Sequence, residues 1–403
     1  MLKHIMILIA GAMVFMMIAC NDSEVSNPVD DDIDPIDDII KSVLNLPNTP
    51  FNYSDIDLPD HLKMNFLMGP GQNAASDNDN TPSDNMITND GATLGRVLFY
   101  DECLSANGTI SCASCHKQDK AFSDDATLSL GFEGGETRRH SMSLINASLY
   151  GRGRFFWDER AETLEDQVLM PFQDEVEMGL TLEELVSITQ SKDYYPSLFE
   201  KAFGDSAVTS DRISKALAQF VRSMVSVNSK YDEGREMVNN PNQDFPNFTE
   251  SENNGKFLFF APVPAGGGSC VGCHSTEAFI NPDNGTTNNG LDLTTENDEG
   301  VFEAIPNPRF RGAFKVPSLK SIELSAPYMH DGRFETLEEV VEHYNSGIQN
   351  HTNLGQALRD PMNGQPVRMN FTDQEKIDLV NFLKTLTDNT LTVNERFSNP
   401  FVR

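Results

Sequence analysis

The 403-residue chain is poor in basic residues, has a single tryptophan, and contains no apolar run long enough to span a membrane. Its 30 Lys and Arg against 61 Asp and Glu give a formal net charge of −31 at pH 7. A surface of this charge repels phosphate backbones and anionic lipid headgroups. The shortage of bases therefore excludes nucleic-acid binding. It favours a cationic diffusing partner, unless the charge serves solubility alone.

The longest apolar run, residues 5–19, has 15 residues, whereas a membrane-spanning helix needs about 20. It follows Lys3 and is typical of a secretory signal. Cys20 comes directly after Ala19, where a lipoprotein signal is cleaved and its cysteine acylated. We therefore expect a lipoprotein-type signal at residues 1–20 and a protein on the periplasmic side of the cell envelope, whose only membrane contact is a lipid anchor on Cys20. An ordinary signal peptide and an uncleaved anchor are the alternatives.

Cysteines are also few, six in all, and their spacing does not suit a disulfide scaffold in an exported protein. If Cys20 belongs to the signal, Cys103 is the odd one, and we expect it to be a buried free thiol. The other four form two Cys-x-x-Cys pairs. These pairs need an explanation other than disulfide bonds.

Alternating strand patterns are missing as well, and from Thr93 onward the apolar periodicity is helical. Residues 213–224 carry an apolar stripe behind Ser210, which predicts an amphipathic helix capped by that serine. Residues 379–386 carry a second stripe, behind a Thr-x-x-Glu capping box at residues 372–375. The sequence therefore predicts an all-α protein.

Composition divides the chain into segments. Residues 21–60 carry eleven acids against one base, which predicts a solvated acidic tether. A segment rich in Asn and Pro at residues 239–247 predicts a domain break. After the signal we therefore expect an acidic N-terminal extension at residues 21–84 and two domains, at 85–238 and 239–403.

An internal repeat relates these two domains. Residues 156–168 read FWDERAETLEDQV, and residues 329–341 read MHDGRFETLEEVV, at a constant offset of 173. Each copy has its own Cys-x-x-Cys-His motif upstream. Two copies of one structural unit have therefore been joined.

The Cys-x-x-Cys-His motifs are the most specific chemical signal in the chain: Cys112, Cys115 and His116 in the first, Cys270, Cys273 and His274 in the second. Two cysteines three residues apart can form thioethers to the vinyl groups of one haem, and the adjacent histidine then reaches the iron. A four-cysteine zinc site would leave both histidines unexplained. We therefore predict two covalently bound haems c, with His116 and His274 as proximal ligands.

The repeat also predicts that the two haems differ on their other face. Tyr344 shares the apolar face of a helix capped by Thr336 and Glu339, and the equivalent position in the first copy is Pro171, which cannot bind iron. The first haem would then keep an open face for chemistry, while the second stores electrons. In the alternative, Tyr344 only packs, and Met329 or another methionine binds the second iron.

Two polar residues accompany the open face. If that face binds a peroxide, a nearby group must move a proton as the O–O bond breaks. Glu177 is the candidate base, and Gln167 is the candidate that orients the substrate by hydrogen bonding. The alternative is that both are ordinary surface residues.

The twin CxxCH motifs, FWDERAETLEDQ with EVEMG (residues 156–167 and 175–179), and the segment PSL...APYMHDGRFETLEEVVEHY (residues 317–344) resemble the di-haem cytochrome c peroxidase/MauG family over residues 85–390. The resemblance implies two cytochrome c-like domains that face each other, with peroxide meeting the first haem and electrons passing through the second. It also implies that Trp157 lies between the haems, that Glu177 is the catalytic glutamate, and that Gln167 and Pro171 form the distal pair of the MauG branch.

Departures from the family pattern indicate which branch of the family the chain resembles. Ordinary peroxidases of the family have methionine at the position of Tyr344 and a removable distal histidine in the loop that here covers residues 129–135, which contains none. Both features resemble the MauG branch. The additional tryptophan of MauG itself would fall at Gly268, and Trp157 is the only tryptophan of the chain.

We therefore expect an exported di-haem peroxidase that reduces hydrogen peroxide with electrons from a small redox protein, a c-type cytochrome or a cupredoxin. A MauG-like oxidase that modifies a protein, and a di-haem electron carrier without catalysis, are the alternatives. Whether the chain is a monomer or a homodimer stays open.

The resemblance leaves one metal and two histidines undecided. The family's calcium ion takes two backbone carbonyls, which match Ser325 and Pro327, but the position of its asparagine ligand aligns with His140, a poor ligand for a hard cation. Calcium binding and its absence both stay open. His140 is expected to pack or to support the site rather than to be a distal ligand, and His330 to hydrogen-bond near the second haem.

Overall fold

The computed structural model describes residues 40–64, 74–281 and 285–402. The predicted signal and lipid anchor, with Cys20, lie outside these residues. Within the described part, no helix is long and apolar enough to cross a membrane. By their internal contacts, these described residues belong to a single unit.

The fold is mostly helical, as expected. The helices of the first half are α2 (Asp60–Lys63), α3 (Asn89–Tyr100), α4 (Cys112–Cys115), α5 (Leu164–Gln167), α6 (Met170–Gln173), α7 (Leu182–Gln190), α8 (Tyr195–Phe203) and α9 (Ser210–Arg222). Those of the second half are α10 (Lys230–Glu236), α11 (Glu250–Phe260), α12 (Val301–Ala304), α13 (Leu337–Glu342), α14 (Asp373–Lys384) and α15 (Asn389–Val393). The sheet found in the described segments has two short antiparallel strands, β1 (Thr286–Thr287) and β2 (Phe314–Lys315).

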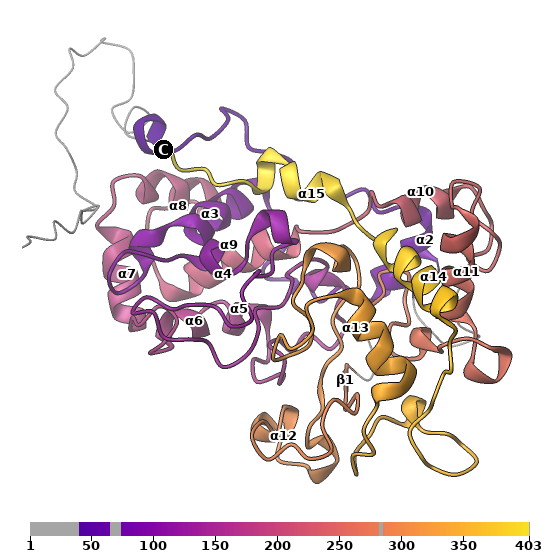
Figure 1. The fold of residues 1–403 in the computed structure, drawn as a ribbon. Coiled ribbons are helices and arrows are strands. Elements are labelled where there is room, and N and C mark those ends of the chain that lie inside the picture. Colours follow the sequence, from indigo (N-terminus) through magenta and orange to yellow (C-terminus); the bar gives the residue numbers. More distant parts are fainter. Residues whose placement is uncertain (1–39, 65–73, 282–284, 403) are drawn as a thin grey trace, which may run out of the picture. The chain divides into compact units, whose positions relative to one another are not determined.

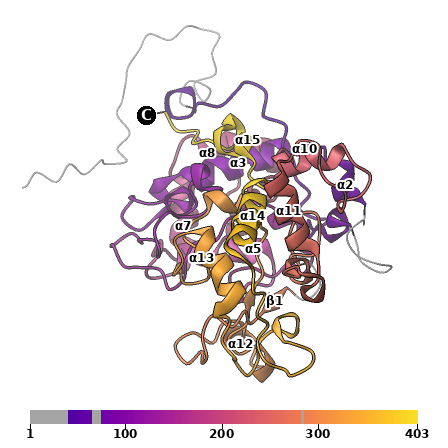
Figure 2. The ribbon, with the colours of Figure 1, turned by 45° about the vertical axis from the view of Figure 1, so that its right-hand side comes forward.

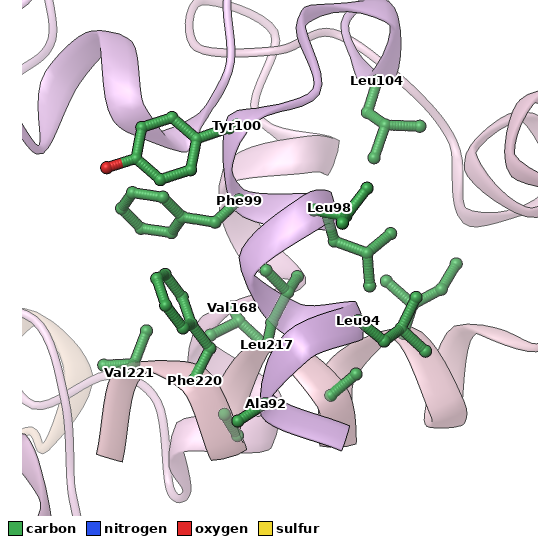
Figure 3. Close-up of a cluster of buried hydrophobic side chains, with 14 of the residues drawn as sticks. Ala92, Leu94, Leu98, Phe99, Tyr100, Leu104, Val168, Leu217, Phe220 and Val221 are labelled. Atoms are coloured by element: carbon green, nitrogen blue, oxygen red, sulfur yellow. The ribbon is translucent and has the colours of Figure 1, made fainter. Parts of the chain in front are cut away.

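The first hydrophobic core forms where α3 crosses α9 (Figure 3). The rings of Phe99 and Phe220 pack edge to face, with centroids 5.4 Å apart. The backbones approach closely at Gly95, since a β-carbon there would lie 2.0 Å from the carbonyl oxygen of Ala216. Any larger residue would push the helices apart.

The second core repeats this crossing with α11 and α14, which lie side by side in both views (Figure 1, Figure 2). The rings of Phe259 and Phe382 lie 5.2 Å apart. A β-carbon at Gly255 would come within 1.9 Å of the carbonyl oxygen of Asp378. The two halves therefore share one helix crossing as well as one sequence motif.

The motif that repeats at an offset of 173 also folds alike in its two copies. Each copy closes with an antiparallel bridge, Phe155 with Ala161 and Tyr328 with Phe334. In each, an aspartate pairs with the arginine two residues later, Asp158 with Arg160 and Asp331 with Arg333. In each, a threonine caps the next helix, Thr163 for α5 and Thr336 for α13. The repeat seen in the sequence is thus a repeat of structure.

The expected tether is wrong for the residues that the structure describes in it. Ile40, Leu44 and Tyr53 are buried in the first core, and Leu62 is buried in a smaller cluster. The hydroxyl of Tyr53 donates to the carbonyl of Arg396 at 2.5 Å. A few buried apolar side chains are therefore enough to pack this acidic segment against the rest of the protein.

The C-terminal segment departs from the expected domain order. After α14 the chain returns to the first core, as the yellow segment with α15 near α3 shows in Figure 1. Leu391 and Phe397 are buried there, and the hydroxyl of Tyr100 donates to the carbonyl of Phe397 at 2.6 Å. The division of the chain into two domains at residue 238 stays a prediction.

Local expectations had mixed outcomes. The capping boxes before α13 and α14 are confirmed. The cap of α9 is Thr209 and not Ser210, because the Thr209 side chain accepts the hydrogen bond from the amide of Arg212. Cys103 is neither buried nor a free thiol: it is half-buried and disulfide-bonded.

Candidate functional site: two cavities with a common wall

Each Cys-x-x-Cys-His motif lines its own cavity. Cys112, Cys115 and His116 line the first, and Cys270, Cys273 and His274 line the second. The described residues contain no cluster of three or more His, Cys, Asp or Glu side chains that could hold a metal ion. The four cysteines therefore do not converge on one zinc ion.

Short helical turns position the thiols. In the first motif Ser111 and Ser114 form a capping box around α4, and in the second a 3-10 turn covers Cys270–Gly272. All four thiols of the two motifs are free. Burial raises the pKa of Cys112 to about 12 and that of Cys270 to about 12. The four thiols are therefore reduced and unpaired, the state from which thioethers to haem vinyl groups form.

The two histidines are held in the same way. The Nδ1 of His116 contacts the carbonyl oxygen of Phe122 at 2.9 Å, and the Nδ1 of His274 contacts that of Phe279 at 3.2 Å. A carbonyl can only accept, so Nδ1 carries the proton and Nε2 keeps its lone pair. Burial lowers the pKa of both rings, that of His274 to about 4. Both are neutral imidazoles, the form that binds iron.

Seven of the described residues line both cavities and so form a common wall: His140, Met142, Ser143, Trp157, Lys315, Pro317 and Ser318. The structure thus brings Trp157 to the wall between the two sites. Its indole Nε1 donates to the carbonyl of His140 at 2.8 Å. Its own carbonyl accepts from the amide of Lys315 at 2.8 Å.

Gln167, Pro171 and Glu177, which the sequence analysis assigned to the open face of the first haem, all line the first cavity. Burial raises the pKa of Glu177 to about 7, with a further rise from Asp174 and an opposing effect of Arg160. The loop at residues 129–135, which lacks the distal histidine of the ordinary branch, lies beside this segment. The amide of Phe132 donates to the carbonyl of Glu177 at 3.1 Å.

Tyr344 and Met329 both line the second cavity, so geometry alone leaves both candidate ligands in reach of it. Tyr344 lies in a π-helical segment, His343–Gly347, that continues α13. Burial raises the pKa of Tyr344 to about 12, and a hydrogen bond with Asn289 acts in the opposite direction. The amide of Asn289 also donates to the sulfur of Met329 at 3.4 Å.

His140 is tied to the protein at both ring nitrogens. Its Nδ1 contacts the carbonyl of Ala126 at 3.1 Å, and its Nε2 lies 3.2 Å from the hydroxyl of Ser123. This geometry favours the packing role over that of a distal ligand. His330 stacks on Phe314 with ring centroids 3.7 Å apart and lines the second cavity.

Ser325 and Pro327, the candidate carbonyl ligands of calcium, line the second cavity as well. The side chain of His140, which aligns with the asparagine of the family's calcium site, has both nitrogens engaged with protein atoms. It offers no oxygen to a hard cation. Of the family's three ligand positions, this leaves only the two carbonyls of Ser325 and Pro327 for calcium.

Two residues of the cavities escaped the sequence analysis, Asn289 and Lys315. Asn289 belongs to an Asn-rich segment without periodicity, so nothing marked it. Lys315 lies two residues before the segment 317–344 that resembles the family, and nothing in the sequence shows that a single lysine is buried. Both become visible only when the cavities are formed.

Comparison with known proteins agrees with this geometry. The sequence profile of a family described as di-haem cytochrome c peroxidase matches residues 89–238. The methylamine utilization protein MauG of Methylophilus methylotrophus is 32% identical over 317 residues, which cover 77% of this chain and 87% of that protein. The cytochrome c551 peroxidase of Nitrosomonas europaea is 34% identical over 300 residues, 74% of this chain and 80% of that protein. Among solved structures, a MauG-like protein associated with microbial copper homeostasis matches with a TM-score of 0.70 and 32% identity, over 80% of this chain and 96% of that one.

Proposed function

Since the chain belongs to the di-haem cytochrome c peroxidase family, we propose that it is an exported enzyme that reduces hydrogen peroxide to water with electrons from a small redox protein. The observation that carries the proposal is the difference between the cavities. Gln167, Pro171 and Glu177 line the first, whereas Tyr344 lines the second. The first therefore suits substrate chemistry and the second electron storage.

The residues of both cavities fit a covalently bound haem. Each cavity offers two free thiols and one neutral imidazole whose Nε2 keeps its lone pair. Cys112 and Cys115 would hold the first haem and Cys270 and Cys273 the second, with His116 and His274 as iron ligands. When bound, the haems supply the redox chemistry, because their irons carry the two electrons that the reduction of one peroxide consumes.

Glu177 moves the proton at the first cavity. Reduction of one hydrogen peroxide to two waters consumes two electrons and two protons, and cleavage of the O–O bond needs a proton on the departing oxygen. With a pKa raised to about 7, the Glu177 carboxyl can take a proton from one peroxide oxygen and deliver it to the other. The carboxamide of Gln167 orients the peroxide, since it offers both donor and acceptor atoms.

Trp157 passes electrons between the two sites. It is the only tryptophan of the chain, and it lines both cavities. Hydrogen bonds at both its indole nitrogen and its carbonyl hold it in this place. Tyr344 would bind the second iron, where a phenolate oxygen stabilises the ferric state.

A MauG-like oxidase that modifies a bound protein is the second candidate, favoured by Tyr344. The position where MauG has its additional tryptophan is Gly268, close to the sulfur atoms of Cys270 and Met369. Without an aromatic ring at Gly268, the outward path for electrons from a protein substrate is missing. Peroxide reduction is therefore the better-supported function.

The electron donor should be cationic. The net charge of −31 accelerates association with a basic protein and slows that of an acidic one. A basic c-type cytochrome or a cupredoxin would serve. We further propose that the protein works on the periplasmic side of the cell envelope.

Steady-state peroxide consumption with a panel of reduced donors tests the proposal. The holoprotein should consume peroxide with at least one small donor, faster with a basic donor than with an acidic one, and the preference should weaken at high salt. A holoprotein with both haems that consumes no peroxide with any donor would overturn the assignment and favour the electron carrier. Peroxide-dependent change in a protein partner, without donor turnover, would favour the MauG-like oxidase.

A further inference from the structure

Lys315 is a buried lysine without an anion. It lies on β2 and is 7% exposed. In the described parts of the chain its ammonium has no hydrogen-bond acceptor and no ion-pair partner. Its Nζ lies over two aromatic rings, 4.3 Å from the ring centroid of Tyr150 and 5.7 Å from that of Phe155. A buried charge without a partner is costly, so an ammonium in this place indicates a missing anion.

The nearest carboxylate does not supply that anion. Glu159 acts on Lys315 only by longer-range attraction. Its own oxygens are occupied, because Arg152 donates to them at 2.9 and 2.5 Å and the hydroxyl of Tyr150 donates as well. Glu159 is fully buried within this group. Lys315 therefore remains free to bind another carboxylate.

Lys315 lines both cavities, and among the described residues it is the one Lys, Arg, Asp or Glu side chain that lines the second. The first cavity has other cations, such as Arg139 and Arg160, and both of these pair with Asp158. In the part of the chain that the structure describes, the lining of the second cavity thus carries a single charge, the ammonium of Lys315.

A haem brings two propionate carboxylates into its site. We infer that the Nζ of Lys315 binds a propionate of the haem in the second cavity through a charge-assisted hydrogen bond. Such bonds are about twice as strong as those between neutral groups. The pairing satisfies both the lysine and a carboxylate that would otherwise be buried without a cation.

The pairing also affects the reduction potential. Reduction of a haem iron adds one negative charge, and a nearby ammonium stabilises it. Loss of the Lys315 charge should therefore make the potential of the second haem more negative. The first haem, whose cavity has arginines of its own, should change less. This inference rests on the proposed binding of two haems but not on peroxide as the substrate.

The test compares the holoprotein with Lys315→Met and Lys315→Arg, in the absence of peroxide. Potentiometric titration gives the potential of each haem, and resonance Raman spectra report the propionate bending modes. Lys315→Met should lower the potential of the second haem and shift one propionate band, while Lys315→Arg should restore both. Unchanged potentials and unchanged propionate bands in Lys315→Met would overturn the inference.

A matched control and a second variant separate the effect of Lys315 from a general effect of losing a buried lysine. Lys256 is also buried, at 2% exposure, but its ammonium donates to the carbonyls of Pro241 and Gln243 at 2.7 and 2.5 Å, and it lines neither cavity. Lys256→Met should leave both potentials and the propionate bands unchanged. If Lys315→Met does not mature, Lys315→Gln removes the charge but keeps a polar donor, and an unchanged second potential in that variant contradicts the inference equally.

Discussion

The indole of Trp157 donates a 2.8 Å hydrogen bond to the carbonyl of His140, and both residues line both cavities. The amide of His140 in turn donates to the carbonyl of His330 at 2.9 Å, and His330 lines the second cavity. A chain of hydrogen bonds therefore runs from the tryptophan of the first repeat copy to its repeat partner in the second. This places one rigid aromatic ring in the wall between the two sites.

Trp157→Phe tests the role of the tryptophan in this wall. The variant keeps an aromatic ring but loses the N–H donor and leaves the His140 carbonyl without it, which should lower the free energy of unfolding by about 1–3 kcal/mol. Both haems should remain, since no cysteine or histidine ligand changes, while peroxide turnover falls because electrons cross the wall more slowly. Chemical denaturation and steady-state assays measure the two effects. Turnover equal to that of the parent protein would remove Trp157 from the electron path.

Glu177→Gln keeps the shape of the side chain and removes the base. Loss of a positioned acid–base group lowers rates by about 10²- to 10⁴-fold, and haem content should not change. Glu175→Gln is the matched control, because Glu175 is exposed two residues away and does not line the cavity. If both variants turn over peroxide at the parent rate, the proton is moved by another group.

The pKa of Glu177 also predicts a pH dependence of stability. Burial raises this pKa from its ordinary 4.5 to about 7 in the folded protein, so the folded state holds the proton more tightly than the unfolded chain. The stabilisation that the raised pKa of Glu177 gives the folded state is fully present below pH 4.5. The free energy of unfolding should therefore fall as the pH rises from 4.5 to 7. Denaturation of parent and Glu177→Gln proteins across this range isolates the effect. A difference between them that stays constant with pH would refute the raised pKa.

The two cysteine pairs should act independently. Replacing Cys112 and Cys115 by serine should remove one haem equivalent and leave the second, and the reverse should hold for Cys270 and Cys273, because the pairs line separate cavities. Pyridine haemochrome analysis counts the haems directly. Each variant should also be less stable, since the haem fills a cavity beside the core of its half. Two haems retained in either double variant would exclude covalent attachment at that motif.

The sequence was sufficient to predict those features that depend on local residue patterns. The CxxCH motifs and the capping boxes of α13 and α14 depend on residues a few positions apart, so spacing alone reveals them. The repeat is visible because its two copies keep similar residues at a constant offset of 173. Thr209 took the cap from Ser210 because two adjacent hydroxyl residues compete for one helix start, and one residue of backbone register decides between them.

Long-range packing was not predictable in the same way. Tyr53 and Phe397 meet in the first core with ring centroids 6.2 Å apart although they are 344 residues apart in sequence, and the acidic composition of the first segment hid its few buried side chains. Lys315 and Asn289 likewise gain meaning only from the cavities that they line. Their roles depend on which segments the fold brings together, and periodicity carries no information about that.

The central claim is that the first haem has an open face and the second is bound by Tyr344. Resting-state EPR of the fully oxidised holoprotein tests it most directly, with Tyr344→Phe as the comparison. We expect a high-spin signal from the first haem, unchanged by the substitution, and a low-spin signal from the second haem that Tyr344→Phe alters. Two low-spin signals that are both indifferent to Tyr344→Phe would contradict the account.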